Sequence, residues 1–285
     1  MICSKHSMGG KLVSEQSKTV LFIDVGNTAA KYTIINNDTI TNIGLADVDL
    51  RIDTFAVNES PVQLLSSVNS IYLSYVRVPV WLESLKLHAA AQQVPIHIAK
   101  TDKHIRINHS ILTNSYSDIS TMGIDRWLAM IATVGLYPKK SDFVIVDAGT
   151  AITCDVIFRH AHIGGWIAPG LSSIKNSLLN NTENVFKHDD DQLNQKLTLG
   201  KNTPDCVEYG CLAQLNGIVN EGIKQINALS DNYLVIISGG DREKIFQQEK
   251  NNTVYKANIV LLGLIQLAKN HQCHQNFNRY CCFLK

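Results

Sequence analysis

One pattern of residues occurs twice in this chain, and it constrains the fold more than any other feature. The first copy reads LFIDVGNTAAKYTII from Leu21, and the second reads VIVDAGTAITCDVIF from Val144. In each copy an apolar strand ends in Asp, a glycine-containing turn with Thr follows, and a second strand begins. The copies start about 120 residues apart, which is roughly the length of one domain. The repeat therefore predicts two related α/β domains and argues against a short-period solenoid.

Strands and helices alternate around both copies, which is typical of a layered α/β fold. A helix expected over residues 122–137, with Thr121 as its cap, closes the first half. A polar stretch that opens with Pro138 marks the boundary between a domain at residues 19–138 and a domain at residues 139–270. The other expected strands lie within residues 19–25, 31–37, 38–45, 71–76, 95–100, 142–158 and 233–241, and the other helices at 61–69, 79–93, 203–229 and up to about Lys269.

Charge and cysteine content limit the class of protein. The chain has 26 Lys and Arg residues against 25 Asp and Glu residues, which gives a formal net charge of +1. This balance supplies no basic field for nucleic acid, and the longest apolar stretch, ANIVLLGLIQLAK, is too short and interrupted to span a bilayer. We expect no nucleic-acid partner and no membrane insertion. Seven cysteines favour reduced thiols over a disulfide framework, which predicts a cytoplasmic location.

Both ends of the chain differ in composition from the segments between them. Residues 1–18 are rich in Ser, Gly and Lys and lack the apolar region of a signal peptide, so we expect a disordered leader. Residues 271–285 are expected to form a disordered tail. The tail carries ligand types that zinc uses, in a spacing that fits no standard finger. These residues are His271, Cys273, His274, Cys281 and Cys282. A separate group of histidines, His97, His104 and His109, is expected on the solvated surface.

The chemistry of the two glycine turns favours phosphate binding. Backbone N–H groups in such turns bind phosphate oxygens, and Thr28, Thr150 and Lys31 add further donors. Asp24 and Asp147 would repel a bare phosphate, but a cation between them removes the repulsion. We interpret the pair as acid-ended hairpins that face each other across a cleft and hold a metal-nucleotide. The alternative is two ordinary hairpins whose Asp side chains cap their turns. Neither GxxxxGKS/T nor GxGxxG occurs, which leaves P-loop and Rossmann binding unsupported.

Six segments, in order, carry a resemblance to a known family. They are DVGNTAAK, YSDISTMGIDR, DAGTAITCD, GGWIAPG, GKNT and SGGD, and the resemblance covers about residues 19–270. The series resembles type III pantothenate kinase, within the superfamily of acetate and sugar kinases, Hsp70 and actin. The resemblance implies two related RNase-H-like domains that flank a nucleotide cleft. It also implies ATP-dependent phosphorylation of pantothenate to 4'-phosphopantothenate, the first step of coenzyme A biosynthesis.

The resemblance also implies a role for each matching residue. The catalytic base would be Asp125, and Asp147 would help to hold a monovalent cation, either K⁺ or NH₄⁺, while Mg²⁺ accompanies ATP. The protein would be a homodimer. The residues implied in ATP binding are Asp24, Val25, Gly26, Asn27, Thr28, Ala29, Ala30, Lys31 and Thr150, and those implied in pantothenate binding are Tyr116, Gly123, Ile124, Asp125, Arg126 and Thr203.

Elementary chemistry gives these residues both functional and structural explanations. Phosphoryl transfer to an alcohol needs an acceptor for the hydroxyl proton. Asp125, in the first turn of a helix, could serve, although the helix dipole also favours an acid there. The fork of Arg126 suits a carboxylate or phosphate, and its alternative is a surface ion pair. Tyr116 could be a core aromatic, and Thr203, before a proline, could cap its helix.

Three alternative functions compete with the pantothenate kinase interpretation. A kinase of the same superfamily could act on a sugar, carboxylate or polyphosphate, although the segment GIDR argues against it. A non-catalytic regulator of transcription is disfavoured because Asp125 and Lys31 are present. An RNase-H-like nuclease would need a tight carboxylate cluster for two metals. The chain departs from the family pattern at Ile119, where proline is common, and at Ser238, where threonine is usual.

Overall fold

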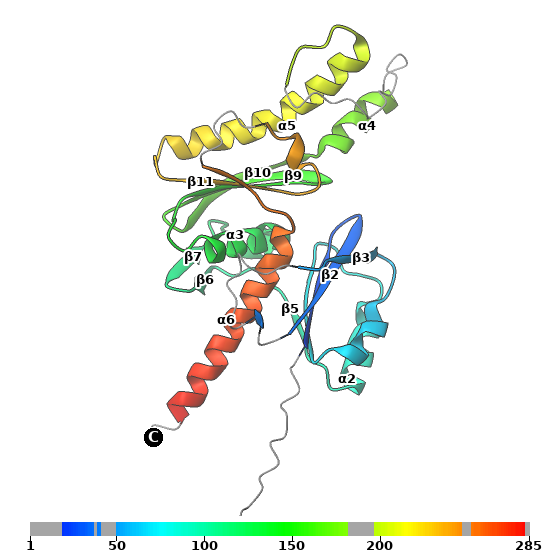
Figure 1. The fold of residues 1–285 in the computed structure, drawn as a ribbon, viewed down its shortest axis with the longest axis vertical. Helices are drawn as coiled ribbons and strands as arrows, with labels where there is room; N and C mark the ends of the chain where they lie inside the picture. Colours follow the sequence, from blue (N-terminus) through cyan, green and yellow to red (C-terminus); the bar gives the residue numbers. More distant parts are fainter. Residues whose placement is uncertain (1–18, 37–38, 41–49, 182–196, 247–251, 283–285) are drawn as a thin grey trace, which may run out of the picture.

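The computed structural model describes residues 19–36, 39–40, 50–181, 197–246 and 252–282. Two β-sheets are separated by a pair of helices, α3 (Ile124–Leu136) and α6 (Ile259–Cys282), and other helices cover the outer faces (Figure 1). The leader expected at residues 1–18 lies outside the described residues. So do nearly all of the strand expected at residues 38–45 and most of the polar loop near residues 180–195.

The first sheet has the strand order β3-β2-β1-β4-β5. Strands β1 and β2 pair antiparallel, as do β2 and β3, whereas β4 is parallel to both β1 and β5. This mixture follows from the chain path, because a tight turn joins β1 to β2 and a longer crossover leads to β4. The strands are β1 (Thr19–Val25), β2 (Ala29–Asn36), β3 (Asp53–Ala56), β4 (Ser70–Tyr75) and β5 (Ile96–Ile98).

The second sheet repeats this arrangement and extends it. Its order is β12-β11-β8-β9-β10-β7-β6. Strands β8, β9 and β10 pair antiparallel in turn, while β11 is parallel to both β8 and β12, as β4 is to β1 and β5. The shared order confirms the predicted pair of related RNase-H-like α/β sheets. The strands are β6 (His104–Ile107), β7 (Ser110–Thr113), β8 (Phe143–Ala148), β9 (Ala151–Phe158), β10 (Ala161–Pro169), β11 (Leu234–Ser238) and β12 (Thr253–Tyr255).

Alternate residues of the central strands face different layers. In β1, Phe22 packs in the core formed with α3 and α6, whereas Leu21 and Ile23 pack against α2 (Leu82–Ala91) and the 3₁₀ helix at Pro61–Ser67. The strands are apolar on both faces because helices cover both. In the same way β8 divides its side chains between the central helices and α5 (Thr203–Asn227). In Figure 1 α5 and α4 (Leu171–Asn181) lie over the outer face of the second sheet.

The hairpin β6–β7 belongs to the second sheet although it precedes α3 in the chain. Strand β7 pairs parallel to β10 through a single register pair, Thr113 with Ala161. This hairpin is not among the strands expected from the sequence. Two strands from the first half of the chain thus complete the sheet of the second half. The boundary between domains at residues 138 and 139 stays a prediction.

Two local predictions were wrong. Thr121 does not cap α3, since it lies in a 3₁₀ turn, Ile119–Thr121, and Gly123 is the residue at the N-cap. Helix α6 does not end near Lys269 but continues to Cys282, so the helix enters the segment expected as a disordered tail. The reason is visible in the sequence, because residues 270–282 contain neither Gly nor Pro to stop a helix.

Candidate functional site

The ends of two equivalent strands form the floor of a cleft between the sheets. Asp24 lies at the end of β1 and Asp147 at the end of β8, and both line one cavity of about 110 Å³. The same cavity is lined by Lys31, by the turn that follows β11 and by the first turn of α6. The structure thus brings the acidic ends of the repeated hairpins into one cavity, as the sequence predicted.

The two glycine turns are each closed by a hydrogen bond from the glycine N–H, and they contact each other, although the first turn is one residue longer. Gly26 N–H donates to the carbonyl of Ala29 at 3.1 Å, and Gly149 N–H donates to the carbonyl of Ala151 at 2.9 Å. The hydroxyl oxygens of Thr28 and Thr150, one from each turn, lie 3.1 Å apart. Residues expected to bind one nucleotide from opposite sides of the cleft are therefore adjacent.

Burial raises the pKa of both cleft carboxyls. For Asp24 the pKa rises to about 6, chiefly by desolvation, with smaller increases from the charges of Asp125 and Asp147. A 2.8 Å hydrogen bond from the Ser74 hydroxyl and the charge of Lys31 oppose the increase. The pKa of Asp147 also rises to about 6, by desolvation and by the Asp125 charge. Because Asp125 acts on both, the three carboxylates share one electrostatic site.

Lys31 brings positive charge to this acidic site. It lies on β2 opposite Asp24 in the strand register, and its Nζ donates to Asn258 Oδ1 at 3.3 Å. Asn258 precedes α6 and has a left-handed backbone with φ of 55°, a conformation that Asn tolerates better than most residues. The sequence analysis missed Asn258, which gave no signal beyond its place before an apolar helix.

The turn after β11 packs closely against the second glycine turn. Gly239 has φ of +92°, and a Cβ there would lie 2.1 Å from the carbonyl oxygen of Ala148. Asp241 N–H also donates to that carbonyl at 3.0 Å. Only glycine fits at residue 239. Ser238, which stands where the family usually has threonine, is buried and lines the cavity.

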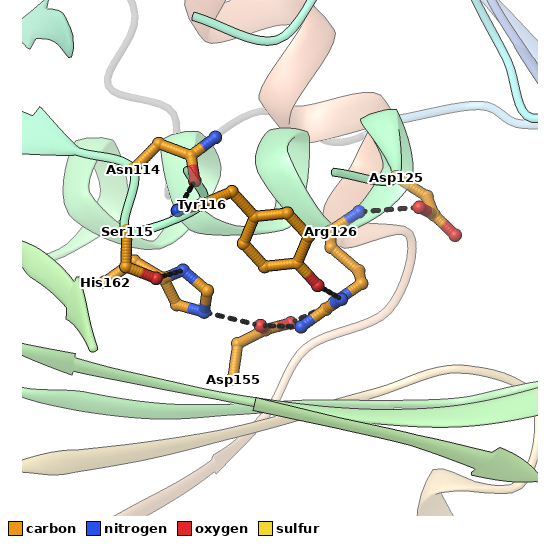
Figure 2. Close-up of polar contacts among 7 residues, drawn as sticks. All are labelled: Asn114, Ser115, Tyr116, Asp125, Arg126, Asp155 and His162. Carbon is orange, nitrogen blue, oxygen red and sulfur yellow. Dashed lines mark hydrogen bonds and ion pairs between the residues drawn. The ribbon is translucent and has the colours of Figure 1, made fainter. Parts of the chain in front are cut away.

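Asp125 and Arg126 lie in the first turn of α3, and their side chains contact different groups. Asp125 Oδ1 accepts from the Arg126 N–H at 2.8 Å, and Gly123 leaves room for this carboxylate, because a Cβ there would lie 2.5 Å from Oδ1. Arg126 is 4% exposed, so it is not the surface ion pair considered from the sequence. Its Nη1 donates to the Tyr116 hydroxyl at 2.7 Å (Figure 2). Tyr116 is partly buried against the main core, so it has both a packing and a polar role.

Two buried residues that the sequence analysis missed complete this network. Asp155, on β9, accepts from Arg126 Nε at 2.9 Å and from Nη2 at 2.5 Å. His162, on β10, lies 2.9 Å from the same carboxylate through Nε2 (Figure 2). Burial by itself would lower the pKa of Arg126, but the hydrogen bonds and charge of Asp155 raise it. The signal available in the sequence was an acid inside the apolar strand ITCDVIF.

Thr203 lies in a different cavity from Asp24 and Asp147. It is the first residue of α5, and the N-cap is Asn202, whose Oδ1 accepts from Asp205 N–H at 2.9 Å. The explanation of Thr203 as a simple cap was therefore wrong. With Lys201 and Cys206 it lines a cavity of about 600 Å³ beside α4 and α5.

Comparisons with known proteins identify the family. The family model for type III pantothenate kinase matches residues 20–225. The chain belongs to the type III pantothenate kinase family. A type III pantothenate kinase of Pseudoalteromonas translucida is 34% identical over 86% of this chain and 94% of its own length. Another, of Pseudoalteromonas atlantica, is 40% identical over 65% of this chain and 71% of its own.

A structural comparison agrees with this fold assignment. A crystal structure described as a Baf family transcriptional activator, from Campylobacter jejuni, matches with a TM-score of 0.55 and 20% identity. The match covers 88% of this chain and 98% of the other, and at this identity it supports the fold alone.

Two further observations concern clusters of metal-binding side chains and long apolar helices. Among the described residues, no group of three or more His, Cys, Asp and Glu side chains lies close enough to hold a metal ion. The three cleft carboxylates interact through their charges without forming such a group. Within the described ranges, no helix is both long and apolar enough to cross a bilayer.

Proposed function

We propose that this chain transfers the γ-phosphoryl group of ATP to the primary hydroxyl of pantothenate, in the cleft that holds Asp24, Asp125 and Asp147. Family membership supplies the reaction and the acceptor. The observation that supports this cleft is the contact between Thr28 and Thr150, which joins the two glycine turns that follow Asp24 and Asp147. The products are ADP and 4'-phosphopantothenate.

The nucleotide would bind between the two turns. The segment of residues 24–31 would bind the phosphates through N–H groups of the turn between β1 and β2, and the hydroxyls of Thr28 and Thr150 would donate to them. Lys31 would add a positive charge, because its ammonium group already lies beside the cavity. The turn containing Gly239 would lie against the nucleoside end of ATP.

Asp125 would act as the general base. It would accept the proton of the pantothenate hydroxyl as the oxygen attacks the γ-phosphorus, while ADP leaves with the electron pair of the broken P–O bond. Its place at the start of α3, within electrostatic range of Asp24 and Asp147, supports this role. Catalysis then depends on position and charge more than on covalent chemistry.

The cleft carboxylates fit cations. Asp24 and Asp147 are partly buried carboxyls whose pKa values rise to about 6, so a bound cation would stabilise the ionised form of each. We propose that Asp147 helps to hold K⁺ or NH₄⁺ and that Mg²⁺ accompanies ATP. These ions supply charge neutralisation for the phosphates when they are bound.

The acceptor would bind beside Tyr116 and Arg126, with the segment from Gly123 to Arg126 along one side. Thr203 lines a different cavity, and a homodimer in which it reaches the acceptor site of a second subunit would explain that separation. Free thiols at Cys154, Cys206 and Cys211 support a location in the reducing cytoplasm.

A coupled ADP-release assay tests the proposal. ADP should form only when pantothenate, Mg²⁺·ATP and K⁺ or NH₄⁺ are present together, and replacement of K⁺ by Na⁺ should reduce the rate. A panel of sugars and small carboxylates serves as the acceptor control. ADP formation with one of these acceptors and none with pantothenate would assign the cleft to another kinase reaction of the superfamily.

A further inference from the structure

The buried side chain of His162 is built into the wall of the acceptor site that we propose. His162 is 2% exposed and lies on β10, opposite the strand that carries Asp155. Its Nε2 lies 2.9 Å from Asp155 Oδ1, and its Nδ1 lies 3.0 Å from the Ser115 hydroxyl. Ser115 directly precedes Tyr116. One imidazole thus connects the residue before Tyr116 with the carboxylate that binds Arg126 (Figure 2).

The protonation pattern of this network follows from its chemistry. The ionised carboxylate of Asp155 can only accept hydrogen bonds, so His162 Nε2 must carry a proton. In the neutral ring Nδ1 then has no proton, and it accepts from the Ser115 hydroxyl. Arg126 fills the remaining positions of Asp155 through Nε and Nη2. Both oxygens of the buried carboxylate are satisfied.

The two strands are shaped to hold this network. The register of β10 shifts between His162 and Gly164, and Gly164 has φ of +141°, so a bulge turns the strand at this point. Gly165 is the direct partner of Asp155 in the sheet. A Cβ at Gly165 would lie 2.6 Å from Asp155 Oδ1 and 2.8 Å from Arg126 Nη2. The missing side chain leaves the space that the guanidinium needs.

Arg126 keeps donors for a ligand after these bonds are made. A guanidinium has five N–H groups, and three of them bond to Asp155 and Tyr116. The direction of the other two depends on how the guanidinium plane is held. Arg126 also lies 5.7 Å from the centroid of the Tyr116 ring, and that ring lies 6.0 Å from the His162 ring.

We propose that His162 is a positioning residue for the pantothenate kinase reaction, which fixes Arg126 through Asp155 and Tyr116 through Ser115. The inference rests on the proposed role of Arg126 and Tyr116 in binding the acceptor. His162 itself does not touch the acceptor or the nucleotide. Loss of its two hydrogen bonds allows the guanidinium plane and the Tyr116 segment to move, which weakens acceptor binding and leaves nucleotide binding intact.

The test compares the Michaelis constants of the two substrates. His162→Leu should raise the KM for pantothenate by roughly ten- to hundredfold, as expected for loss of a hydrogen bond to a buried charge. Its KM for ATP should stay within about twofold of wild type. Ser115→Ala, which removes only the bond to Nδ1, should raise the KM for pantothenate by about two- to tenfold. Thermal melting establishes that each variant is folded.

Two further variants separate the explanations. Thr133→Val removes a buried hydrogen bond to the Ala129 carbonyl in the same helix as Arg126, away from the network. It should lower the melting temperature and leave both KM values unchanged. Arg126→Lys tests the proposed function, because a lysine cannot keep the fork to Asp155, and the KM for pantothenate should rise.

The outcomes are distinct. An unchanged KM for pantothenate in folded His162→Leu, together with an increase in Arg126→Lys, overturns the role of His162 and leaves the proposed acceptor site in place. An unchanged KM in Arg126→Lys overturns the acceptor site itself. If His162→Leu does not fold, Ser115→Ala and His162→Gln decide the question, and an unchanged KM for pantothenate in both overturns the proposal.

Discussion

Thr28 and Thr150 lie 122 residues apart in the chain, yet their hydroxyl oxygens are 3.1 Å apart across the cleft. Each hydroxyl belongs to one copy of the repeated strand–turn–strand unit. In the nucleotide site that we propose, two hydroxyls this close together would donate to the same phosphate group. The contact joins the two copies of the repeat.

Removal of either hydroxyl should weaken ATP binding. Thr28→Ala and Thr150→Ala should each raise the KM for ATP by roughly tenfold, because each loses a hydrogen bond to a charged phosphate. The double variant should lose less than the product of the two effects, because adjacent groups that share one partner are not additive. Steady-state kinetics with varied ATP measures this, and Thr54→Ala, exposed on β3, is the control. Full multiplication of the two effects would mean that the hydroxyls act on separate groups.

Asp125→Asn should reduce kcat by about 10²–10⁴-fold, because the amide cannot accept the hydroxyl proton. Nucleotide affinity, measured by equilibrium binding of an ATP analogue, should stay close to wild type, because Asp125 does not belong to either glycine turn. A turnover equal to wild type in the folded variant would remove Asp125 from the role of base.

The raised pKa of Asp147 predicts an unusual dependence of stability on pH. The pKa of this carboxyl rises from 3.8 to about 6 on folding. Between these values the folded state binds more protons than the unfolded state, so its stability falls as the pH rises through this window. Asp147→Asn removes the buried charge and should stabilise the cation-free protein at pH 7.5 by on the order of 1–3 kcal/mol.

Urea unfolding at two pH values checks this prediction. Near pH 4, where the folded carboxyl is already protonated, Asp147→Asn should have little effect. Asp53→Asn, a change at an exposed carboxylate on β3, should be neutral at both pH values. Equal effects of Asp147→Asn at pH 4 and pH 7.5 would show that ionisation of this residue does not determine the difference.

The fall in activity at acidic pH should depend on the ionisation of Asp24 and Asp147. Asp24 and Asp147 must be ionised to attract cations, so kcat/KM for ATP should fall as the pH drops through about 6. Saturating K⁺ and Mg²⁺ stabilise the ionised forms and should move this fall to lower pH. A fall that stays at the same pH when the cation concentration changes would contradict the assignment.

Two neighbouring glycines offer a matched test of the third turn. Gly239→Ala should destabilise the protein by at least about 1–3 kcal/mol, because residue 239 has a positive φ and its Cβ would overlap the Ala148 carbonyl. Gly240 lines the same cavity, and a Cβ there meets no atom within 4 Å. Gly240→Ala should leave the urea midpoint almost unchanged. Similar losses in both variants would mean that the close approach at residue 239 does not determine stability.

Much of the cleft could be predicted because the repeat places equivalent groups at equivalent positions. The Asp that ends an apolar strand recurs in both copies, and paired sheets bring Asp24 and Asp147 to one cavity. The turns, their threonines and Lys31 follow from local sequence. These features depend on strand periodicity and turn chemistry, which are local properties.

The Arg126 network could not be predicted in the same way. Its members come from α3, β9, β10 and the segment after β7, and their approach depends on a bulge and on the absence of a Cβ at Gly165. Neither feature has a local period. Asp155 could have been marked as an acid within an apolar strand, but its partner could not be chosen from sequence. Helix α6 continues past Lys269 because the polar segment that follows contains no helix-breaking residue before Cys282.

The position of the hairpin β6–β7 limits how this enzyme could be divided. Its two strands come from the first half of the chain and form the outer edge of the sheet of the second half. A fragment cut after residue 138 would carry these strands away and expose β10 as an unpaired edge, open to association with other chains. The two halves of the chain therefore share a sheet, and neither half keeps its full set of strand partners when they are separated.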